Sequence, residues 1–167
     1  MPEFPMLLLL CGFFLICPHI ADGKVNDEAS CAIDAALELK GDLYFFKDSQ
    51  YAWWSYNNGE NQLKHVGDMK EFAYEMPTNI DAAVAGNDVD YIFKGKRYWK
   101  KHRFDGRVLG GDKGYPLTDL SSQLTRRVVA AAVFLEGSSN NTYFFLDDNT
   151  YARYTARIDK DFSEKPE

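Results

Sequence analysis

A repeat with a fixed period constrains this chain more than any other feature. Two segments of a first copy return 47 residues later without a gap, and both return again in a looser third copy. The first segment and its counterparts are Ile33-Asp34-Ala35-Ala36-Leu37, Ile80-Asp81-Ala82-Ala83-Val84 and Val129-Ala130-Ala131-Ala132-Val133. The second segment and its counterparts are Tyr44-Phe45-Phe46-Lys47, Tyr91-Ile92-Phe93-Lys94 and Tyr143-Phe144-Phe145-Leu146. A constant period of this length indicates one supersecondary unit per copy, stacked on its neighbours.

Each copy has the residue pattern of short strands separated by polar turns. In the first copy, strands are expected over 34–39, 43–47 and 51–56, which favours an antiparallel meander. Residues 68–74 and 117–124 lack strand alternation and have helix-compatible spacing. Alanine is depleted in ordinary strands, so the paired alanines indicate close backbone approach near a crowded axis. The sequence therefore predicts an all-β chain of small sheets, each with a short helix.

The N-terminus has the pattern of a secretory signal. Residues 6–16 form an apolar run that is too short for a bilayer span of about 20 residues. We expect a signal peptide over 1–23, cleaved after Gly23 or alternatively after Ala21, followed by a short segment over 24–30. No later segment is a candidate membrane span, so the expected location is secreted and extracellular.

Secretion would make covalent modification possible at two residues, since disulfides and N-linked glycans form in the secretory compartment. Cys31 would be the one cysteine of the mature chain, either a small buried apolar residue or one half of a bridge to a partner. Asn140 begins the sequon Asn140-Asn141-Thr142 in a polar run where a loop is expected, and is a candidate N-glycosylation site.

Charge limits the partners that are open to this chain. The 25 acidic and 19 basic residues give a net charge of −6, which excludes nucleic acid as a general partner. One run, KGKRYWKKHR, is strongly basic and could bind a sulfated glycosaminoglycan or an acidic protein surface. The alternative is a solvated hairpin face. The six candidates are Lys94, Lys96, Arg97, Lys100, Lys101 and Arg103.

Catalytic patterns are missing from the sequence. It contains no H-E-x-x-H, no G-x-S-x-G and no glycine-rich phosphate loop, and Cys31 has no neighbouring histidine. We therefore expect a protein that is not an enzyme. His65 and His102 are the histidines that would remain for haem ligation after signal removal, and they occupy non-matching places in different copies.

The combined pattern resembles the hemopexin-like repeat family. The resemblance rests on Ile-Asp-Ala-Ala, on Tyr-Phe-Phe-Lys after seven intervening residues, and on the aromatic strand that follows. Gly114-Tyr115-Pro116-Leu117 resembles the family's turn into the outer strand and helix. It implies a β-propeller that has four blades in the family and about three here. The hemopexin-like domain would cover 31–167, in repeats of about 31–77, 78–125 and an incomplete 126–167.

The resemblance also implies sites. In the family, backbone carbonyls of the inner strands hold structural Ca²⁺ or Na⁺ in a central tunnel, which suits hard cations. The matching positions here are Asp34, Ala36, Asp81, Ala83, Ala130 and Ala132. The alternative for both aspartates is that they bond backbone amides of neighbouring blades. Haem binding is implied only weakly, since in hemopexin it needs two propellers and their linker.

The function expected from these features is a secreted, non-catalytic module that binds an extracellular protein or matrix ligand. A haem carrier and a truncated module of a matrix metalloproteinase are the alternatives. The resemblance places the usual partner of Cys31 at the end of a fourth blade. A disulfide-linked or blade-completing oligomer is therefore a further possibility.

Overall fold

Three antiparallel sheets follow one another along the chain. The computed structural model describes residues 33–39, 41–55, 62–86, 88–136 and 139–154. The chain divides into Met1–Ile33 and Asp34–Glu167, and every element named below belongs to the second unit. In the part of the chain that the structure describes, no helix is long and apolar enough to cross a bilayer.

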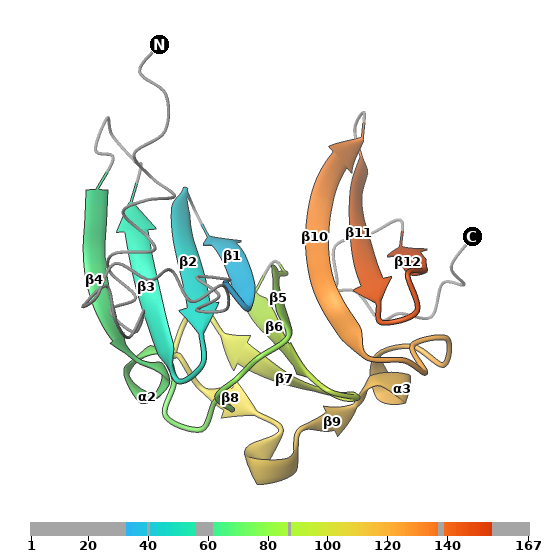
Figure 1. Cartoon of the computed structure of the whole chain (residues 1–167), viewed down its shortest axis with the longest axis horizontal. Helices are drawn as coiled ribbons and strands as arrows, with labels where there is room; N and C mark the ends of the chain where they lie inside the picture. Colours follow the sequence, from blue (N-terminus) through green and yellow to red (C-terminus); the bar gives the residue numbers. More distant parts are fainter. Residues whose placement is uncertain (1–32, 40, 56–61, 87, 137–138, 155–167) are drawn as a thin grey trace, which may run out of the picture. The chain divides into compact units, whose positions relative to one another are not determined.

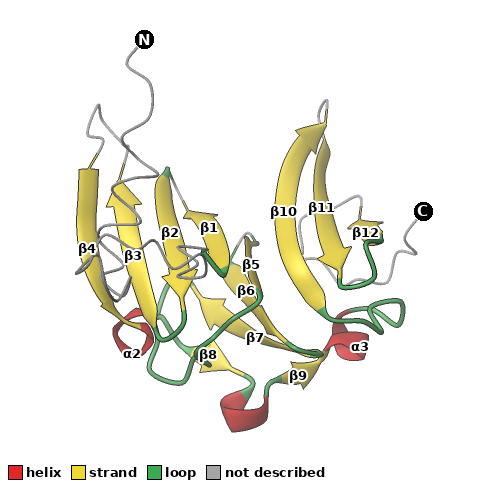
Figure 2. Ribbon diagram, viewed as in Figure 1, coloured by secondary structure: helices red, strands yellow, loops and turns green. Residues whose placement is uncertain are grey.

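The first sheet has the order β1-β2-β3-β4, and the third has the order β10-β11-β12 (Figures 1 and 2). The second has the order β5-β6-β7-β8, with β9 also paired to β7. The bounds in the first sheet are β1 Ala35–Leu39, β2 Asp42–Lys47, β3 Gln50–Ser55 and β4 Gln62–Asp68. Those in the second are β5 Ala82–Ala85, β6 Val89–Lys94, β7 Arg97–His102, β8 Val108–Leu109 and β9 Tyr115–Pro116. Those in the third are β10 Val128–Glu136, β11 Ser139–Leu146 and β12 Tyr151–Tyr154.

Short helices follow the first two sheets. They are α2 Met69–Phe72, the 3₁₀ turn η2 Gly111–Lys113 and α3 Leu117–Leu120. Asp68 caps α2 by accepting a hydrogen bond from the Lys70 amide at 2.8 Å, while Glu71 reaches back to the Asp68 amide. The expected helices over 68–74 and 117–124 are therefore present but shorter. The expectation of an all-β chain built from three meanders is confirmed.

Strand register corrects the alignment of the third copy. Ala35 pairs with Phe46 and Ala82 pairs with Phe93, whereas Phe145 pairs with Ala130. Ala130 therefore matches the first alanine of the other copies, and not their aspartate as the sequence suggested. The residue at the aspartate position is Val129, which lies in a β-bulge.

The core forms where consecutive sheets meet. The first strand of each sheet, β1, β5 or β10, is called its inner strand. The inner strand β5 contacts both β1 and β10. One buried cluster joins the first sheet to the second and includes Phe46 and Ile92; another joins the second to the third and includes Phe93 and Phe144. Strand alternation explains this division, because successive residues of a strand point to opposite faces of its sheet. The second repeat thus supplies one apolar face to the sheet before it and the other to the sheet after it.

Two glycines shape the loop after β8. The indole of Trp99 packs against Gly110 and Gly114 and donates a hydrogen bond from Nε1 to the Gly111 carbonyl at 2.8 Å. Gly114 has φ +64°, and a Cβ there would lie 2.7 Å from the indole. Glycine at this position therefore lets the chain turn into β9 over the ring.

Candidate functional site

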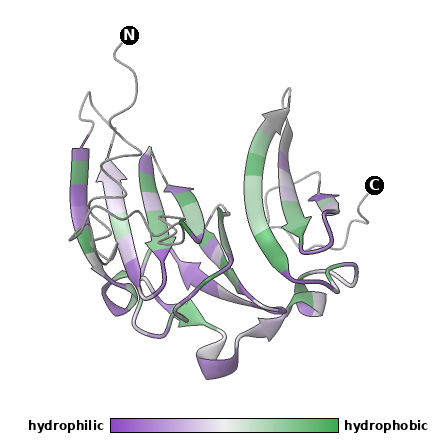
Figure 3. Ribbon diagram, viewed as in Figure 1, coloured by the Kyte–Doolittle hydropathy of each residue, from purple (hydrophilic) through white to green (hydrophobic). Residues whose placement is uncertain are grey.

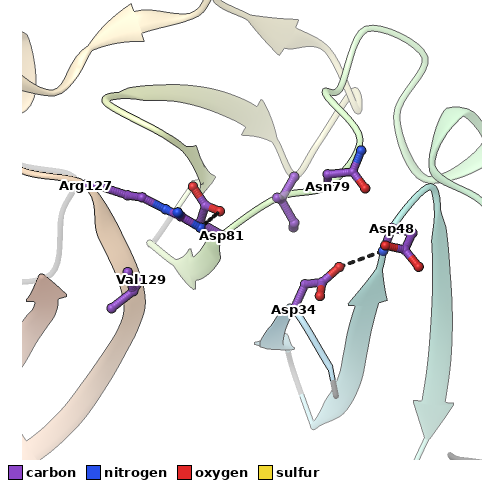
Figure 4. Close-up of a pocket in the computed structure, with 7 residues that line it drawn as sticks. Asp34, Asp48, Asn79, Asp81, Arg127 and Val129 are labelled. Atoms are coloured by element: carbon purple, nitrogen blue, oxygen red, sulfur yellow. Dashed lines mark hydrogen bonds and ion pairs between the residues drawn. The ribbon is translucent and has the colours of Figure 1, made fainter. Parts of the chain in front are cut away.

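A polar pocket of about 290 Å³ lies where the inner strands of the three sheets begin. It gathers residues from all three repeats, and Figure 4 shows their side chains around it. The lining residues are Asp34, Asp48, Asn79, Ile80, Asp81, Arg127 and Val129. The three residues that register places at equivalent positions, Asp34, Asp81 and Val129, all line this pocket, which supports the corrected alignment.

Both carboxylate oxygens of Asp34 accept hydrogen bonds from residues of its own sheet. Its Oδ2 accepts a hydrogen bond from the Asp48 amide at 2.7 Å, and its Oδ1 pairs with Lys47 Nζ at 3.1 Å. The pKa of Lys47 is raised, chiefly by this hydrogen bond from its ammonium to Asp34. Asp48 has φ +53°, a backbone conformation that residues other than glycine rarely adopt. The Asp34 carboxylate therefore stabilises this turn through its hydrogen bond with the Asp48 amide.

Asp81 repeats this arrangement with one change. Its Oδ2 accepts from the Gly95 amide at 2.6 Å, at the equivalent turn position, where φ is +58°. Its Oδ1, however, pairs with the guanidinium of Arg127, which leads into the third sheet. Both aspartates therefore bond turn amides of their own sheets, which differs from the alternative interpretation that they bond amides of neighbouring blades.

These hydrogen bonds and ion pairs bear on whether the pocket could bind a cation. All four oxygens of Asp34 and Asp81 already accept hydrogen bonds, and Lys47 and Arg127 neutralise both carboxylates. Among the described residues no group of three or more His, Cys, Asp or Glu side chains could hold a metal ion. Each carboxylate already has a cationic partner, so the oxygen donors that the family's pattern would use for Ca²⁺ are the backbone carbonyls.

The six tunnel candidates occupy neighbouring strands. Ala36, Ala83, Ala130 and Ala132 lie in β1, β5 and β10, and Asp34 and Asp81 directly precede the first two of these strands. Because β5 contacts both β1 and β10, the candidates of consecutive repeats lie near one another.

The basic run does not gather on one surface. Lys94 Nζ donates to the Thr78 carbonyl at 2.6 Å, and Arg103 Nε pairs at 2.7 Å with Asp90, which is fully buried. Lys101 lies 4.7 Å from the centre of the Phe72 ring, and burial lowers its pKa. Lys100 lies over the rings of Tyr91 and Tyr98. Lys96 and Arg97, at the β6–β7 turn, are the two classed as exposed.

The two histidines lie in different sheets. His65 lies in β4, the outermost strand of the first sheet, where its Nε2 is 3.0 Å from Glu71 Oε2 and its ring contacts that of Tyr51. His102 ends β7 in the second sheet.

Three further expectations concern the margins of the described residues. The signal peptide, the segment 24–30 and Cys31 lie outside them. Asn140 lies in β11 opposite Leu135, so the sequon is in a strand and not in a loop as expected. The other two sequon residues, Asn141 and Thr142, are buried.

Exposed aromatic side chains are the surface feature that sequence reasoning missed. Phe104, in the turn between β7 and β8, is fully exposed, and Tyr74 is 83% exposed. Phe134, Phe145 and Tyr151 of the third sheet are also exposed. The sequence gives no clear signal that separates them from the many buried aromatic residues. The polar neighbours of Phe104 are a weak signal for that residue.

The fold defines a class of protein before any comparison is made. Repeated antiparallel meanders that pack inner strand beside inner strand form a partial β-propeller. Among solved structures, a 2S albumin seed protein from Dolichos aligns with a TM-score of 0.65 and 17% identity, covering 83% of this chain and 67% of the other. A hemopexin-fold protein from cow pea aligns with a TM-score of 0.57 and 18% identity, covering 74% and 62%.

Sequence comparisons identify the family. The hemopexin model matches residues 33–65. Human neutrophil collagenase is 31% identical over 125 residues, which are 72% of this chain and 24% of the relative. Pig vitronectin is 35% identical over 78 residues, which are 41% of this chain and 17% of the relative. The chain belongs to the hemopexin-like repeat family, and it spans about a quarter or less of the length of these curated relatives.

Proposed function

We propose that this chain is a secreted, non-catalytic hemopexin-like module that binds an extracellular protein or matrix component, with Phe104 as its anchor. The observation that carries the proposal is the complete exposure of the Phe104 side chain on an ordered turn. Exposed large aromatic side chains that insert into a partner supply much of the binding energy of protein interfaces.

The turn that carries Phe104 is held from both ends. The His102 amide donates to the Arg107 carbonyl at 2.9 Å, and the Gly106 amide donates to the His102 carbonyl at 2.9 Å. The preceding residue, Arg103, is fixed by its ion pair with buried Asp90. Because the backbone is already ordered, binding through Phe104 would cost little conformational entropy.

Charged groups flank the ring on this turn. The Asp105 carboxylate accepts a hydrogen bond from the Arg107 amide at 3.0 Å, and this bond lowers the pKa of Asp105. Asp105 and Arg107 are both exposed beside Phe104. An apolar anchor bordered by charges of both signs suits a protein surface better than a uniformly anionic polymer.

The relatives support the same class of function. The match to neutrophil collagenase covers 72% of this chain and 24% of that protein. Vitronectin is similar over 41% of this chain. Secretion rests on the signal-like apolar run at residues 6–16.

The test compares single aromatic substitutions on a biosensor coated with decellularised fibroblast matrix. We expect saturable binding of the wild-type chain and at least a tenfold weaker affinity for Phe104→Ala, about 1.4 kcal/mol. Tyr74→Ala is the matched control, since Tyr74 is also highly exposed but lies after α2. Absence of saturable binding, or equal affinity of Phe104→Ala and wild type, would overturn the proposal.

A further inference from the structure

Lys101 differs from the other lysines of the described chain in its surroundings. Lys47 pairs with a carboxylate, and Lys94 donates to a backbone carbonyl. Lys101 is partly buried, yet within the described part of the chain its ammonium forms neither a hydrogen bond nor an ion pair. The contact that it makes there is with the ring of Phe72 in α2, whose centre lies 4.7 Å from Nζ. Four further lysines are exposed and hydrated: Lys64, Lys70, Lys96 and Lys113.

A carboxylate lies opposite Lys101 but is bound to another cation. Asp90, the partner of Lys101 in the register of β6 and β7, is fully buried, and its Oδ1 accepts a hydrogen bond from Arg103 Nε at 2.7 Å. Lys101 therefore lies beside a carboxylate whose charge is already balanced by a guanidinium. His102 pairs in register with Val89 and so lies on the opposite face of β7. Figure 3 shows hydrophilic colouring toward the end of β7.

The surroundings of Lys101 favour the uncharged amine. Burial lowers the pKa of Lys101; the charge of Asp90 opposes this shift, and that of Arg103 adds to it. The face of the Phe72 ring attracts an ammonium, but it replaces only part of the hydration that burial removes. The ring of Tyr44, from the facing sheet, lies 5.6 Å from that of Phe72, and burial raises the pKa of Tyr44, so it brings no charge at neutral pH. At neutral pH Lys101 therefore has a larger uncharged fraction than an exposed lysine.

We propose that Lys101 is a covalent attachment site for small aldehydes, where it reacts before the other lysines of the described chain. A lysine that is partly desolvated, or that lies beside another cation, is activated as a nucleophile. Its uncharged Nζ attacks the aldehyde carbon, a C–N bond forms, and the carbonyl oxygen leaves as water with the two protons of the amine, which gives an imine. The reaction needs no protein partner, so it is independent of binding through Phe104.

The experiment treats the full chain at about pH 7 with ¹³C-formaldehyde, at less than one equivalent, and with cyanoborohydride, which reduces the imine to a methylamine. Peptide fragmentation by mass spectrometry then gives the initial rate at each lysine. We expect the rate at Lys101 to be at least about threefold higher than at Lys100 and at the exposed Lys96. Lys100 is the matched control, because it is the adjacent residue and also lies over aromatic rings, those of Tyr91 and Tyr98.

The pH profile separates this explanation from simple accessibility. Near pH 10.5 an ordinary lysine is about half uncharged, so the advantage of Lys101 should disappear there. A side chain that is merely more accessible would keep its advantage at every pH. An equal or lower rate at Lys101 than at Lys100 near pH 7, or a ratio of the two rates that does not fall as the pH rises, would overturn the proposal.

A variant tests the role of the neighbouring cation. Arg103→Gln lets Asp90 pair with Lys101, so the rate at Lys101 should fall to that at Lys100 or below, and a retained preference in the folded variant would overturn the proposal. Arg97→Gln, at the exposed start of β7, is the matched control and should leave the rate unchanged. Circular dichroism verifies that each variant retains its strands. If Arg103→Gln does not fold, ¹³C NMR of the dimethylated wild-type chain gives the pKa of each lysine, and a value for Lys101 no lower than that of Lys100 would also refute the proposal.

Discussion

Adjacent phenylalanines in β11 give the sharpest test of the sheet faces. Phe144 is 0% exposed and contacts the rings of Phe93 and Tyr154, each at 5.5 Å. Phe145, the next residue, points to the opposite face and is 39% exposed. The two side chains have the same chemistry and lie in the same strand. Substitutions at the two positions therefore differ only in the face of the sheet that they alter.

The expected free energies of unfolding follow from this difference. Phe144→Ala removes a fully buried ring between two sheets and leaves a cavity, which costs about 4 kcal/mol. Phe145→Ala loses about six-tenths of a transfer free energy of roughly 2 kcal/mol and leaves no enclosed cavity, so it costs about 1 kcal/mol. The two variants should therefore differ by about 3 kcal/mol.

Urea unfolding followed by tryptophan fluorescence measures this difference. With a slope of about 2 kcal/mol per molar urea, the midpoint of Phe144→Ala should lie about 1.5 M below that of Phe145→Ala. Phe144→Leu and Phe145→Leu form a milder pair if the first alanine variant does not fold, and the order should be the same. Equal midpoints, or a larger loss at Phe145, would refute the assignment of faces.

Three further changes test the loops, the core and the ion. Burial raises the pKa of Tyr98 to about 12 from its usual 10, so its contribution to stability is complete below pH 10 and is lost toward pH 12; Tyr98→Phe should flatten the fall in urea midpoint over that range. Gly114→Ala should lower stability by about 3 kcal/mol because its Cβ meets Trp99, while Gly106→Ala, with a similar positive φ but open space, should cost about 1 kcal/mol; equal losses would contradict the packing argument. If backbone carbonyls hold a structural cation, 1 mM Ca²⁺ should raise the Tm of chelator-treated protein equally in wild type and in Asp34→Asn, and no rise in either would argue against the ion.

The repeat made most of this architecture predictable from sequence. A gapless period of 47 residues located the first two sheets, and strand alternation placed β1, β2 and β3 to within a residue or two. The fourth strand of the first sheet, Gln62–Asp68, was not placed, because its sequence has few residues with a high strand propensity and mixed burial. Three consecutive alanines in β10 made the third alignment ambiguous by one residue, and only the pairing with β11 fixes it.

The pocket could be predicted only in part. The shared position of Asp34 and Asp81 indicated that they lie near a common axis, and the structure brings both into one pocket. Their cationic partners could not be inferred, because Lys47 comes from the far end of a hairpin and Arg127 from the segment that enters the next sheet. The exposure of Phe104 was indicated only weakly, by its polar neighbours, since sequence does not reliably distinguish an aromatic residue on a turn from one that folds back into the core.

The aspartate position also differs between the three repeats. In the second sheet, Asp81 binds the cation of Arg127, which leads into the sheet that follows, so the position serves as a charged link between sheets. In the third sheet this position is Val129, which is 39% exposed and has no carboxylate to offer. Asp34 pairs with Lys47 of its own sheet, so of these three positions Asp81 is the one that links two sheets by an ion pair.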